Sequence, residues 1–412
     1  MEGYNKKVIM SYWTICRMKT TKKIYVKVSI IFLLGGILLF SSCEKEENQK
    51  IEANRKTLFM YLPWSSNLTN YFYNNISDLE KCITKIGLNN EKVIVFISTG
   101  STEAMMFEIV SSHGRCKREI LKKYKSPPFT TIDGITAILN DVKAFAPASV
   151  YTMIIGCHGM GWLPVYEMKV RSAPHMKMHW EYQGVPLTRS LGGLTAEYPT
   201  DIKPLASGIA NAGMNMESIL FDDCYMSSIE VAYELQHVTK SLIGSTSEMM
   251  AYGMPYAAIG EYLLGNPDYQ SGCEEFYNFY STYEIMPCGT LAVTDCSELE
   301  NMAAIIKSIN SKYSFDKSLR GTIQRLDGYT PVIFYDFADY ITSLCNDPIL
   351  LNQFREQLNH LVPYKTHTKN FYTMAKGIIP INTFSGITTS DPSDNPMTVL
   401  KENTLWYKAA HN

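Results

Sequence analysis

The sequence predicts an α/β fold in which a mainly parallel sheet is flanked by helices. Short apolar runs alternate with helix-length segments, an order typical of parallel strands joined by helical crossovers. The 412 residues are 46% hydrophobic, which is enough to bury a large core, and the chain shows no internal repeat typical of a solenoid or propeller. The formal net charge of -2 lacks the basic excess of nucleic-acid-binding chains, so we expect no nucleic-acid partner.

The predicted strands are runs with almost continuous hydrophobicity, which is typical of parallel strands buried on both faces. We expect strands at 57–63, 92–98, 151–157, 218–222 and 240–246, and further strands at 288–295 and 330–337. The helix-length segments between them predict helices at 69–86, 132–146 and 226–237. We interpret 57–265 as the main α/β domain. Residues 266–412 either complete the same body or form a packed C-terminal subdomain.

The N-terminal segment has the features of an export signal. Lysines precede an apolar run at 28–40 that is too short to span a bilayer comfortably, and small residues follow it. The string FSSC, which ends at Cys43, resembles the lipobox of bacterial lipoproteins, although Phe40 stands where Leu is usual. This resemblance implies an exported protein anchored to a bacterial membrane by a lipid on Cys43.

The boundaries of this export segment follow from its parts. Met18 opens a signal peptide of ordinary length, so we expect the lipoprotein signal peptide at 18–42. Residues 1–17 fit no part of such a signal, and they are a candidate for a misassigned upstream segment. The acidic stretch after Cys43 predicts a solvated tether over 43–56.

Eight cysteines follow Cys43, at irregular spacing and without a CxxC pair. This pattern favours neither a disulfide scaffold nor a zinc ribbon, so we expect most of them to be buried free thiols.

Two predicted strands end in reactive residues. The strand at 151–157 leads to His158, and the strand at 218–222 leads to Cys224. If the two strands are parallel neighbours, both side chains emerge at the same edge of the sheet, where a thiol and an imidazole can act in nucleophilic catalysis. The Gly159 amide would be available for an oxyanion hole.

Some residues around Cys224 favour a reactive thiolate, and others oppose it. Ser227 to Glu230 fit a capping box with Ser227 as the N-cap, so the dipole of the following helix would favour a thiolate. Asp222 and Asp223 oppose this, because nearby carboxylates raise the pKa of a thiol. A cysteine at a strand end also commonly fills the core, and spacing alone leaves both interpretations open.

Three strings carry a family resemblance. HGMGW at 158–162, ILFDDCYMSSIEVAYEL at 219–235 and STSEMMAYGMPY at 245–256 are similar to the motifs of the clostripain family of caspase-like cysteine peptidases. The resemblance implies a caspase-like catalytic domain over 57–265 and an endopeptidase that cuts protein or peptide substrates after Arg or Lys.

The resemblance also implies roles for single residues. Cys224 matches the nucleophile and His158 the catalytic histidine, and the amides of Gly159 and Cys224 would bind the oxyanion. Asp222 matches an acid at the base of the pocket for the basic side chain, and Glu248 is our candidate for a second pocket acid. Asp223 replaces the usual Ala, and together with Cys157 it is unexplained by the family pattern.

Some members of the family cut themselves between the histidine and the cysteine. Here that interval contains an irregular segment at 163–204, rich in Pro, Gly, Met and aromatic residues, which we interpret as a long loop insertion. We expect self-processing within it, without choosing a bond; its basic residues include Lys169, Arg171, Lys177, Arg189 and Lys203. We expect no cofactor. Part of the family depends on calcium, but no EF-hand-like run is present, so calcium stays open.

Three rival interpretations remain. His175 and His179 have the spacing of metal ligands on a helix, but Pro174 and the lack of an HExxH glutamate favour a loop-packed pair without metal. The absence of a GxSxG string argues against an α/β-hydrolase. The alternative function is a catalytically inactive surface lipoprotein that binds peptide or glycan.

Overall fold

The computed structural model describes residues 54–63, 67–100, 102–164, 182–189 and 200–412. The expected upstream segment, the signal peptide, the Cys43 anchor and the tether up to residue 53 lie outside the described residues. The last three residues of the expected tether, 54–56, belong instead to the first strand.

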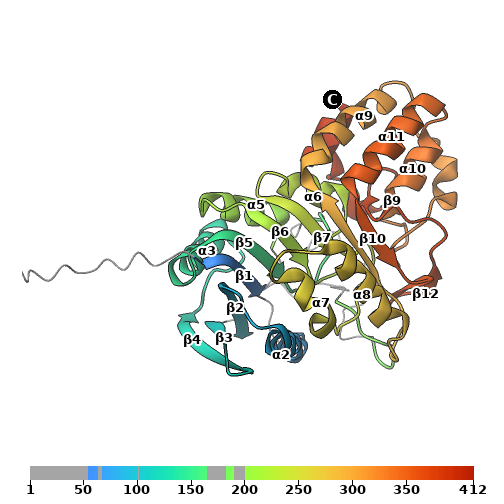
Figure 1. The fold of residues 1–412 in the computed structure, drawn as a ribbon. Helices are drawn as coiled ribbons and strands as arrows, with labels where there is room; N and C mark the ends of the chain where they lie inside the picture. Colours follow the sequence, from blue (N-terminus) through green and yellow to red (C-terminus); the bar gives the residue numbers. More distant parts are fainter. Residues whose placement is uncertain (1–53, 64–66, 101, 165–181, 190–199) are drawn as a thin grey trace, which may run out of the picture. The chain divides into compact units, whose positions relative to one another are not determined.

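Among the described residues, nine strands form one sheet with the order β10-β8-β7-β6-β5-β1-β2-β3-β4 (Figure 1). The five strands β7, β6, β5, β1 and β2 at its centre are parallel, and the strands on either side of them are antiparallel. This confirms the prediction of a mainly parallel sheet. The strands are β1 Asn54–Leu62, β2 Glu91–Gly100, β3 Glu103–Ser112, β4 Arg115–Lys125, β5 Ala148–Ile155, β6 Met216–Phe221, β7 Thr239–Gly244, β8 Thr290–Asp295 and β10 Tyr364–His367.

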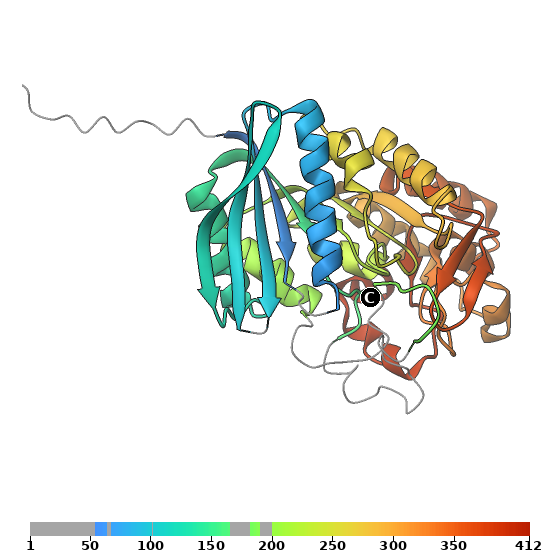
Figure 2. The ribbon, with the colours of Figure 1, turned by 90° about the horizontal axis from the view of Figure 1, so that it is seen from below.

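Helices cover both faces of this sheet. On one face α3, α5 and α6 lie side by side, and on the other α2 packs against α7, which packs against α8 (Figures 1 and 2). Towards the C-terminus α9 packs against α11 and α12. The helices are α2 Thr69–Ile86, α3 Ile132–Phe145, α5 Ile202–Asn211, α6 Ile229–Leu235, α7 Tyr256–Leu263, α8 Tyr269–Ser281, α9 Leu299–Asn310, α10 Phe337–Leu344, α11 Pro348–Leu361 and α12 Leu405–His411.

The longest described helix shows how the sequence specifies its own packing. In α2 the side chains of Phe72, Ile76, Leu79 and Ile83 recur at helical spacing and are fully buried. The helix ends at Gly87, whose φ of 77° is one that glycine adopts readily. The predicted range 69–86 is confirmed because both the periodicity and the stop signal are local.

Strands β3 and β4 were not predicted. β4 is a charged strand at the edge of the sheet, and its residues alternate between exposed and half-buried. Charged side chains on an edge strand disfavour pairing with other chains, and they also remove the hydrophobic signal of a strand.

The expected strand at 330–337 is largely absent. Only Tyr335–Asp336 forms a strand, β9, which pairs with β13, Thr388–Thr389. The Asp327 carboxylate accepts the backbone N–H groups of Ile333 and Phe334 at 2.8 and 2.6 Å. A side chain therefore satisfies the backbone donors that a sheet partner would otherwise take.

The C-terminal part contributes to the central sheet and adds small elements of its own. β8 and β10, from 290–295 and 364–367, extend that sheet beyond β7. A separate antiparallel hairpin joins β11, Asn370–Thr373, to β12, Gly377–Pro380. Short 3₁₀ turns lie at Cys296–Glu298, Lys317–Thr322, Pro396–Thr398 and Lys401–Asn403. Within the described residues, no helix is both long and apolar enough to cross a membrane.

Candidate active site

The ends of β5 and β6 bring His158 and Cys224 to one edge of the sheet. The two strands are parallel neighbours, and Ile155 pairs with Phe221 at their carboxyl ends. Gly159 packs directly on the backbone of Cys224, since a Cβ there would collide with the Cys224 carbonyl oxygen and amide nitrogen. A glycine is therefore required after His158 for the two strand ends to approach.

The Cys224 thiol is fully buried in this state of the chain. Its sulfur accepts the Met249 N–H at 3.1 Å. Burial, followed by the charge of Glu248, raises the pKa of the Cys224 thiol well above its ordinary value. The raised pKa favours the protonated thiol at neutral pH, in the direction expected from the nearby carboxylates.

The helix behind the thiol starts later than predicted. The N-cap of α6 is Ser228, whose hydroxyl accepts the Val231 N–H at 3.3 Å, and not Ser227. Ser227 instead donates its hydroxyl to the Gly386 carbonyl at 2.8 Å. α6 has seven residues and begins at Ile229, five positions after Cys224 in the sequence.

His158 is buried between two polar partners. Its Nδ1 lies 3.0 Å from the Arg189 carbonyl oxygen, and its Nε2 lies 3.0 Å from Asn67 Nδ2. One neutral tautomer satisfies both contacts, with Nδ1–H donating to the carbonyl and Nε2 accepting from the amide. Asn67 therefore orients the imidazole towards the Arg189 carbonyl.

Asp222 lies in a closed pocket that is filled by the side chain of Arg189. Arg189 Nη1 lies 2.8 Å from Asp222 Oδ1, and the two side chains are 0% and 1% exposed. Asp222 also accepts the Met254 N–H at 2.8 Å and the Tyr256 hydroxyl at 2.8 Å. The carboxylate is thus fixed by neutral donors and neutralised by one guanidinium.

Every N–H group of the Arg189 guanidinium has an acceptor. Besides Asp222 Oδ1, these are the Asp222 carbonyl at 2.6 Å, Asn75 Oδ1 at 2.6 Å, the Tyr252 carbonyl at 3.1 Å and the Ala251 carbonyl at 3.2 Å. The guanidinium also lies over the Phe72 ring, 5.4 Å from its centroid. The pocket matches the planar fork of an arginine in both charge and hydrogen bonding.

Gly253 forms one wall of this pocket. Its φ is 78°, and a Cβ there would collide with the Arg189 guanidinium. A side chain at position 253 would therefore both strain the backbone and fill the pocket.

The residues before Arg189 bind as an added strand. The Arg189 N–H donates to the Met249 carbonyl at 2.7 Å, and the Ala251 N–H donates to the Leu187 carbonyl at 2.9 Å. Thr188 and Met250 form the antiparallel bridge between these bonds. Residues 187–189 thus lie on the protein as an extended peptide does in β-augmentation.

The Arg189 carbonyl points at the two reactive strand ends. Its oxygen accepts the Gly159 N–H at 3.2 Å in addition to the contact with His158. The amide of Gly159 is therefore placed as an oxyanion donor would be. The second predicted donor, the Cys224 amide, stays a prediction.

Glu248 lies beside Thr188 and not at the Arg189 guanidinium. Its Oε2 accepts the Thr188 hydroxyl at 2.6 Å and the Met374 N–H at 3.1 Å, and its Oε1 accepts the Tyr225 hydroxyl at 2.9 Å. Tyr225, which follows Cys224, has a φ of 64°, which is uncommon outside glycine. Glu248, our candidate for the second acid of the basic pocket, thus contacts the residue that precedes Arg189 in the bound segment.

Asp223 and Cys157, which the family pattern left unexplained, form a hydrogen-bonded pair. Each lies two residues beyond the paired positions Phe221 and Ile155, so the parallel register sets them side by side. The Cys157 thiol donates to Asp223 Oδ2 at 2.9 Å. Burial raises the pKa of the Asp223 carboxyl well above its ordinary value, and that of the Cys157 thiol as well. Burial thus favours the neutral form of both groups.

Several residues of this site were not named from the sequence. Gly253 and Tyr256 could have been named, because they belong to the YGMPY string already compared with the family motif. Asn67 and Asn75 carried no signal, since they lie just before and within α2, far from both strand ends in sequence.

The remaining candidates lie elsewhere or outside the described residues. Lys169, Arg171 and Lys177, like His175 and His179, fall in 165–181, outside them. Within the described residues, no group of three His, Cys, Asp or Glu side chains could hold a metal ion. The eight described cysteines are all free thiols, and most are buried: Cys82, Cys116, Cys157, Cys224, Cys273, Cys288, Cys296 and Cys345.

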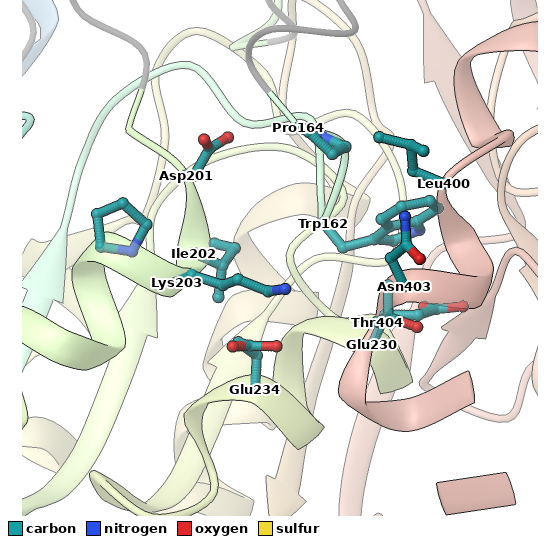
Figure 3. A pocket seen from close by; sticks show the side chains of 11 residues that line it. Trp162, Pro164, Asp201, Ile202, Lys203, Glu230, Glu234, Leu400, Asn403 and Thr404 are labelled. Atoms are coloured by element: carbon teal, nitrogen blue, oxygen red, sulfur yellow. The ribbon is translucent and has the colours of Figure 1, made fainter. Parts of the chain in front are cut away.

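Lys203 lines a separate pocket of about 380 Å³ (Figure 3). This pocket lies between the start of α5, the helix α6 and the turn at 400–404, and Figure 3 shows the carboxylates of Glu230 and Glu234 along it. Trp162 closes one side, and its indole N–H donates to Ser390 Oγ at 2.9 Å. The pocket is distinct from the one that holds Arg189.

The buried ion pair predicts a large stability effect. In a Cys224→Ala chain, Asp222→Asn should lower the free energy of unfolding by about 3–5 kcal/mol, because it leaves the buried Arg189 charge without its partner. Urea denaturation measures this effect. The matched control is Asp394→Asn, which breaks the more exposed pair with Arg320 and should cost at most about 1 kcal/mol. Equal losses in the two variants would contradict the closed pocket.

Comparisons with known proteins identify the family. The model of the clostripain family matches residues 198–391. A secreted C11 cysteine protease of Bacteroides thetaiotaomicron, "iotapain", is 56% identical, with 87% of this chain and 99% of that chain covered and a TM-score of 0.80. A comparison with curated proteins gave no match.

Two further solved structures are similar. A clostripain of Bacteroides thetaiotaomicron ATCC 29148, in complex with the peptide inhibitor BTN-VLTK-AOMK, is 62% identical over 53% of this chain and 98% of that chain, with a TM-score of 0.52. An inactive zymogen C11 protease of Parabacteroides distasonis is 24% identical over 87% and 98% of the two chains, with a TM-score of 0.72, and it supports the fold alone. The chain therefore belongs to the clostripain family of C11 cysteine proteases, as the sequence motifs predicted.

Proposed function

We propose that the chain is an endopeptidase that cleaves peptide bonds after arginine, with Cys224 as nucleophile and His158 as general acid and base. We further propose that it cuts its own Arg189–Ser190 bond. The observation that carries both proposals is the position of Arg189, whose side chain fills the acidic pocket while its carbonyl oxygen contacts His158 Nδ1 and the Gly159 N–H. A substrate would make the same contacts.

The proposed reaction is acyl transfer through a thioester. Cys224 Sγ attacks the carbonyl carbon, and the thiol proton passes to His158 as the C–S bond forms. The negative oxygen faces the Gly159 N–H and the second proposed donor, the Cys224 amide. The C–N bond then breaks and His158 protonates the leaving amine. Water attacks the thioester and releases the carboxylic acid and the free thiol.

The raised pKa of Cys224 bears on this sequence of steps. Because the buried thiol holds its proton at neutral pH, proton transfer to His158 has to accompany the attack. For Nδ1 to take this proton, the imidazole adopts its other neutral tautomer, in which Nε2–H donates to Asn67 Oδ1 at 3.3 Å.

The sequence of a relative's ligand supports the proposed class of substrate. The inhibitor bound to the clostripain of Bacteroides thetaiotaomicron contains the letters VLTK. Residues 187–189 of this chain read Leu-Thr-Arg, so the bound segment and that inhibitor share Leu-Thr followed by a basic residue.

We also propose that the mature enzyme is exported and anchored through Cys43. The support is the lipobox-like FSSC string after an apolar run, together with the secreted relative. No cofactor is part of the proposed reaction.

Self-cleavage should depend on the thiol. The purified wild-type chain should split into two fragments, with Ser190 as the new N-terminus, and Cys224→Ala should remain whole. Intact-mass measurement and N-terminal sequencing give the result. The control is Cys273→Ala, which removes a buried thiol on α8 and should leave processing unchanged. Splitting of purified Cys224→Ala would refute self-cleavage in cis.

Processed enzyme should favour arginine over lysine. A lysine ammonium has three donors for five acceptors that suit a guanidinium, so kcat/KM for an Arg peptide should exceed that for the matched Lys peptide about tenfold or more. Fluorogenic peptides that differ only in this residue measure the ratio, with an Asp peptide as the uncut control. A Lys preference would contradict the pocket's role. No thiol-dependent hydrolysis of any of these peptides would favour the inactive binding lipoprotein.

Lipidation should depend on Cys43. In a bacterial host, the wild-type protein should incorporate a labelled fatty acid and remain with the membrane fraction. Cys43→Ser should lose the label, because the thiol is the atom that carries the lipid in lipoproteins. Cys116→Ser, a half-exposed thiol of β4, serves as the control. Label retained on Cys43→Ser would exclude this anchor.

A further inference from the structure

We propose that Glu248 is a specificity residue that recognises a hydroxyl on the substrate residue preceding the arginine, so that the enzyme prefers threonine or serine there. This inference rests on the proposed function, because it takes residues 187–189 as bound in the manner of a substrate. It assigns Glu248 a different task from the one that the sequence suggested, which was to bind the basic side chain itself.

The contact between the two side chains is direct and enclosed. The Thr188 hydroxyl donates to Glu248 Oε2 at 2.6 Å, and Thr188 is 0% exposed while Glu248 is 6% exposed. Thr188 forms the bridge to Met250, so its side chain is directed by strand pairing and not by the Arg189 pocket. The recognition of position 188 is therefore separate from that of position 189.

The protein holds the Glu248 carboxylate in place before the hydroxyl arrives. The Tyr225 hydroxyl donates to Oε1 at 2.9 Å, and the Met374 N–H donates to Oε2 at 3.1 Å. Tyr225 is itself fixed by stacking on Phe334, with ring centroids 4.9 Å apart. These contacts leave the Oε2 atom aimed at the bound segment, as a preorganised acceptor.

The chemistry of the contact favours a hydroxyl over a methyl group. Threonine and valine have nearly the same shape, so valine would place a methyl group at the position of the hydroxyl, which now lies 2.6 Å from the carboxylate oxygen. A buried carboxylate that loses a donor is destabilised, because its desolvation is no longer compensated by that hydrogen bond. Sites built around a substrate hydroxyl therefore strongly reject analogues that lack it. Burial already raises the pKa of Glu248 to about 7, and the Thr188 hydroxyl is the first of the hydrogen-bond donors that oppose this rise.

The same preference distinguishes the basic residues of the processing segment. Lys169, Arg171, Lys177 and Lys203 follow Met168, Val170, Met176 and Ile202, whereas Arg189 follows Thr188. Of these five basic residues, Arg189 is the one with a hydroxyl residue before it. A pocket for arginine combined with an acceptor for the preceding hydroxyl therefore selects the Arg189–Ser190 bond.

The test compares two peptides on three variants. The fluorogenic peptides Leu-Thr-Arg and Leu-Val-Arg are hydrolysed by processed wild type, by Glu248→Leu and by Glu248→Gln, and the readout is the ratio of their kcat/KM values. Wild type should favour the Thr peptide about tenfold or more. Glu248→Leu should lose the preference, and Glu248→Gln, which keeps an acceptor oxygen, should retain part of it.

The matched control is Glu230→Gln. Glu230 is also a buried acid with its pKa raised to about 7, but it binds Thr389 and Ser390, so the variant should keep the wild-type ratio. A ratio near one in wild type, or an unchanged ratio in Glu248→Leu, would overturn the proposal. Absence of Cys224-dependent hydrolysis of both peptides would overturn the proposed function instead.

The chain's own site supplies a second measurement that leaves Glu248 intact. Thr188→Val should slow self-cleavage about tenfold, and Thr188→Ser, which keeps the hydroxyl, should cleave at nearly the wild-type rate. Equal rates for the valine and serine variants would also refute hydroxyl recognition, even if Glu248→Leu failed to fold.

Discussion

The buried ion pair between Arg189 and Asp222 is the interaction on which the geometry of the site depends. Both charges are removed from water, and such a pair is tolerated only where the remaining hydrogen-bonding groups are satisfied. The acceptors come from Asn75 on α2, from the segment after β7 and from the end of β6, so the pair ties together parts of the chain that are distant in sequence. The position of the Arg189 carbonyl at His158 is a consequence of this anchoring.

The internal arginine in the pocket leaves no room there for the side chain of another substrate. With residues 187–189 in place, the pocket, the edge at 249–251 and the Gly159 amide are all occupied by the chain itself. Cys224 is fully buried in this state, and its burial raises the pKa of the thiol. An intramolecular segment has a high effective concentration, and cutting its bond turns it into a ligand that can dissociate. Under the proposed self-cleavage, this closed state is the one that precedes the first cut.

The two departures from the family pattern beside Cys224 have a structural reason. A carboxylate next to the nucleophile would be a liability if it were ionised, because it would raise the thiol pKa further. Asp223 instead accepts a hydrogen bond from Cys157, and burial favours its neutral form. The pairing follows from the parallel register of β5 and β6, which sets the second residue past each strand end side by side.

The sequence by itself determined the elements whose signals are local. The apolar runs of the five central strands, the periodicity and glycine stop of α2, and the HGMGW and DDC strings at two strand ends were sufficient to predict a parallel sheet with His158 and Cys224 at one edge. The charged edge strand β4, the loop that Asp327 holds at 330–337 and the cap at Ser228 were missed, since each depends on what surrounds the backbone in three dimensions. Only the tertiary structure decided which basic residue fills the pocket, that Asn75 and Gly253 shape it, and that Glu248 faces Thr188. These features depend on contacts between segments that are distant in sequence and that pack around a buried charge. Such contacts produce no periodic pattern in the sequence.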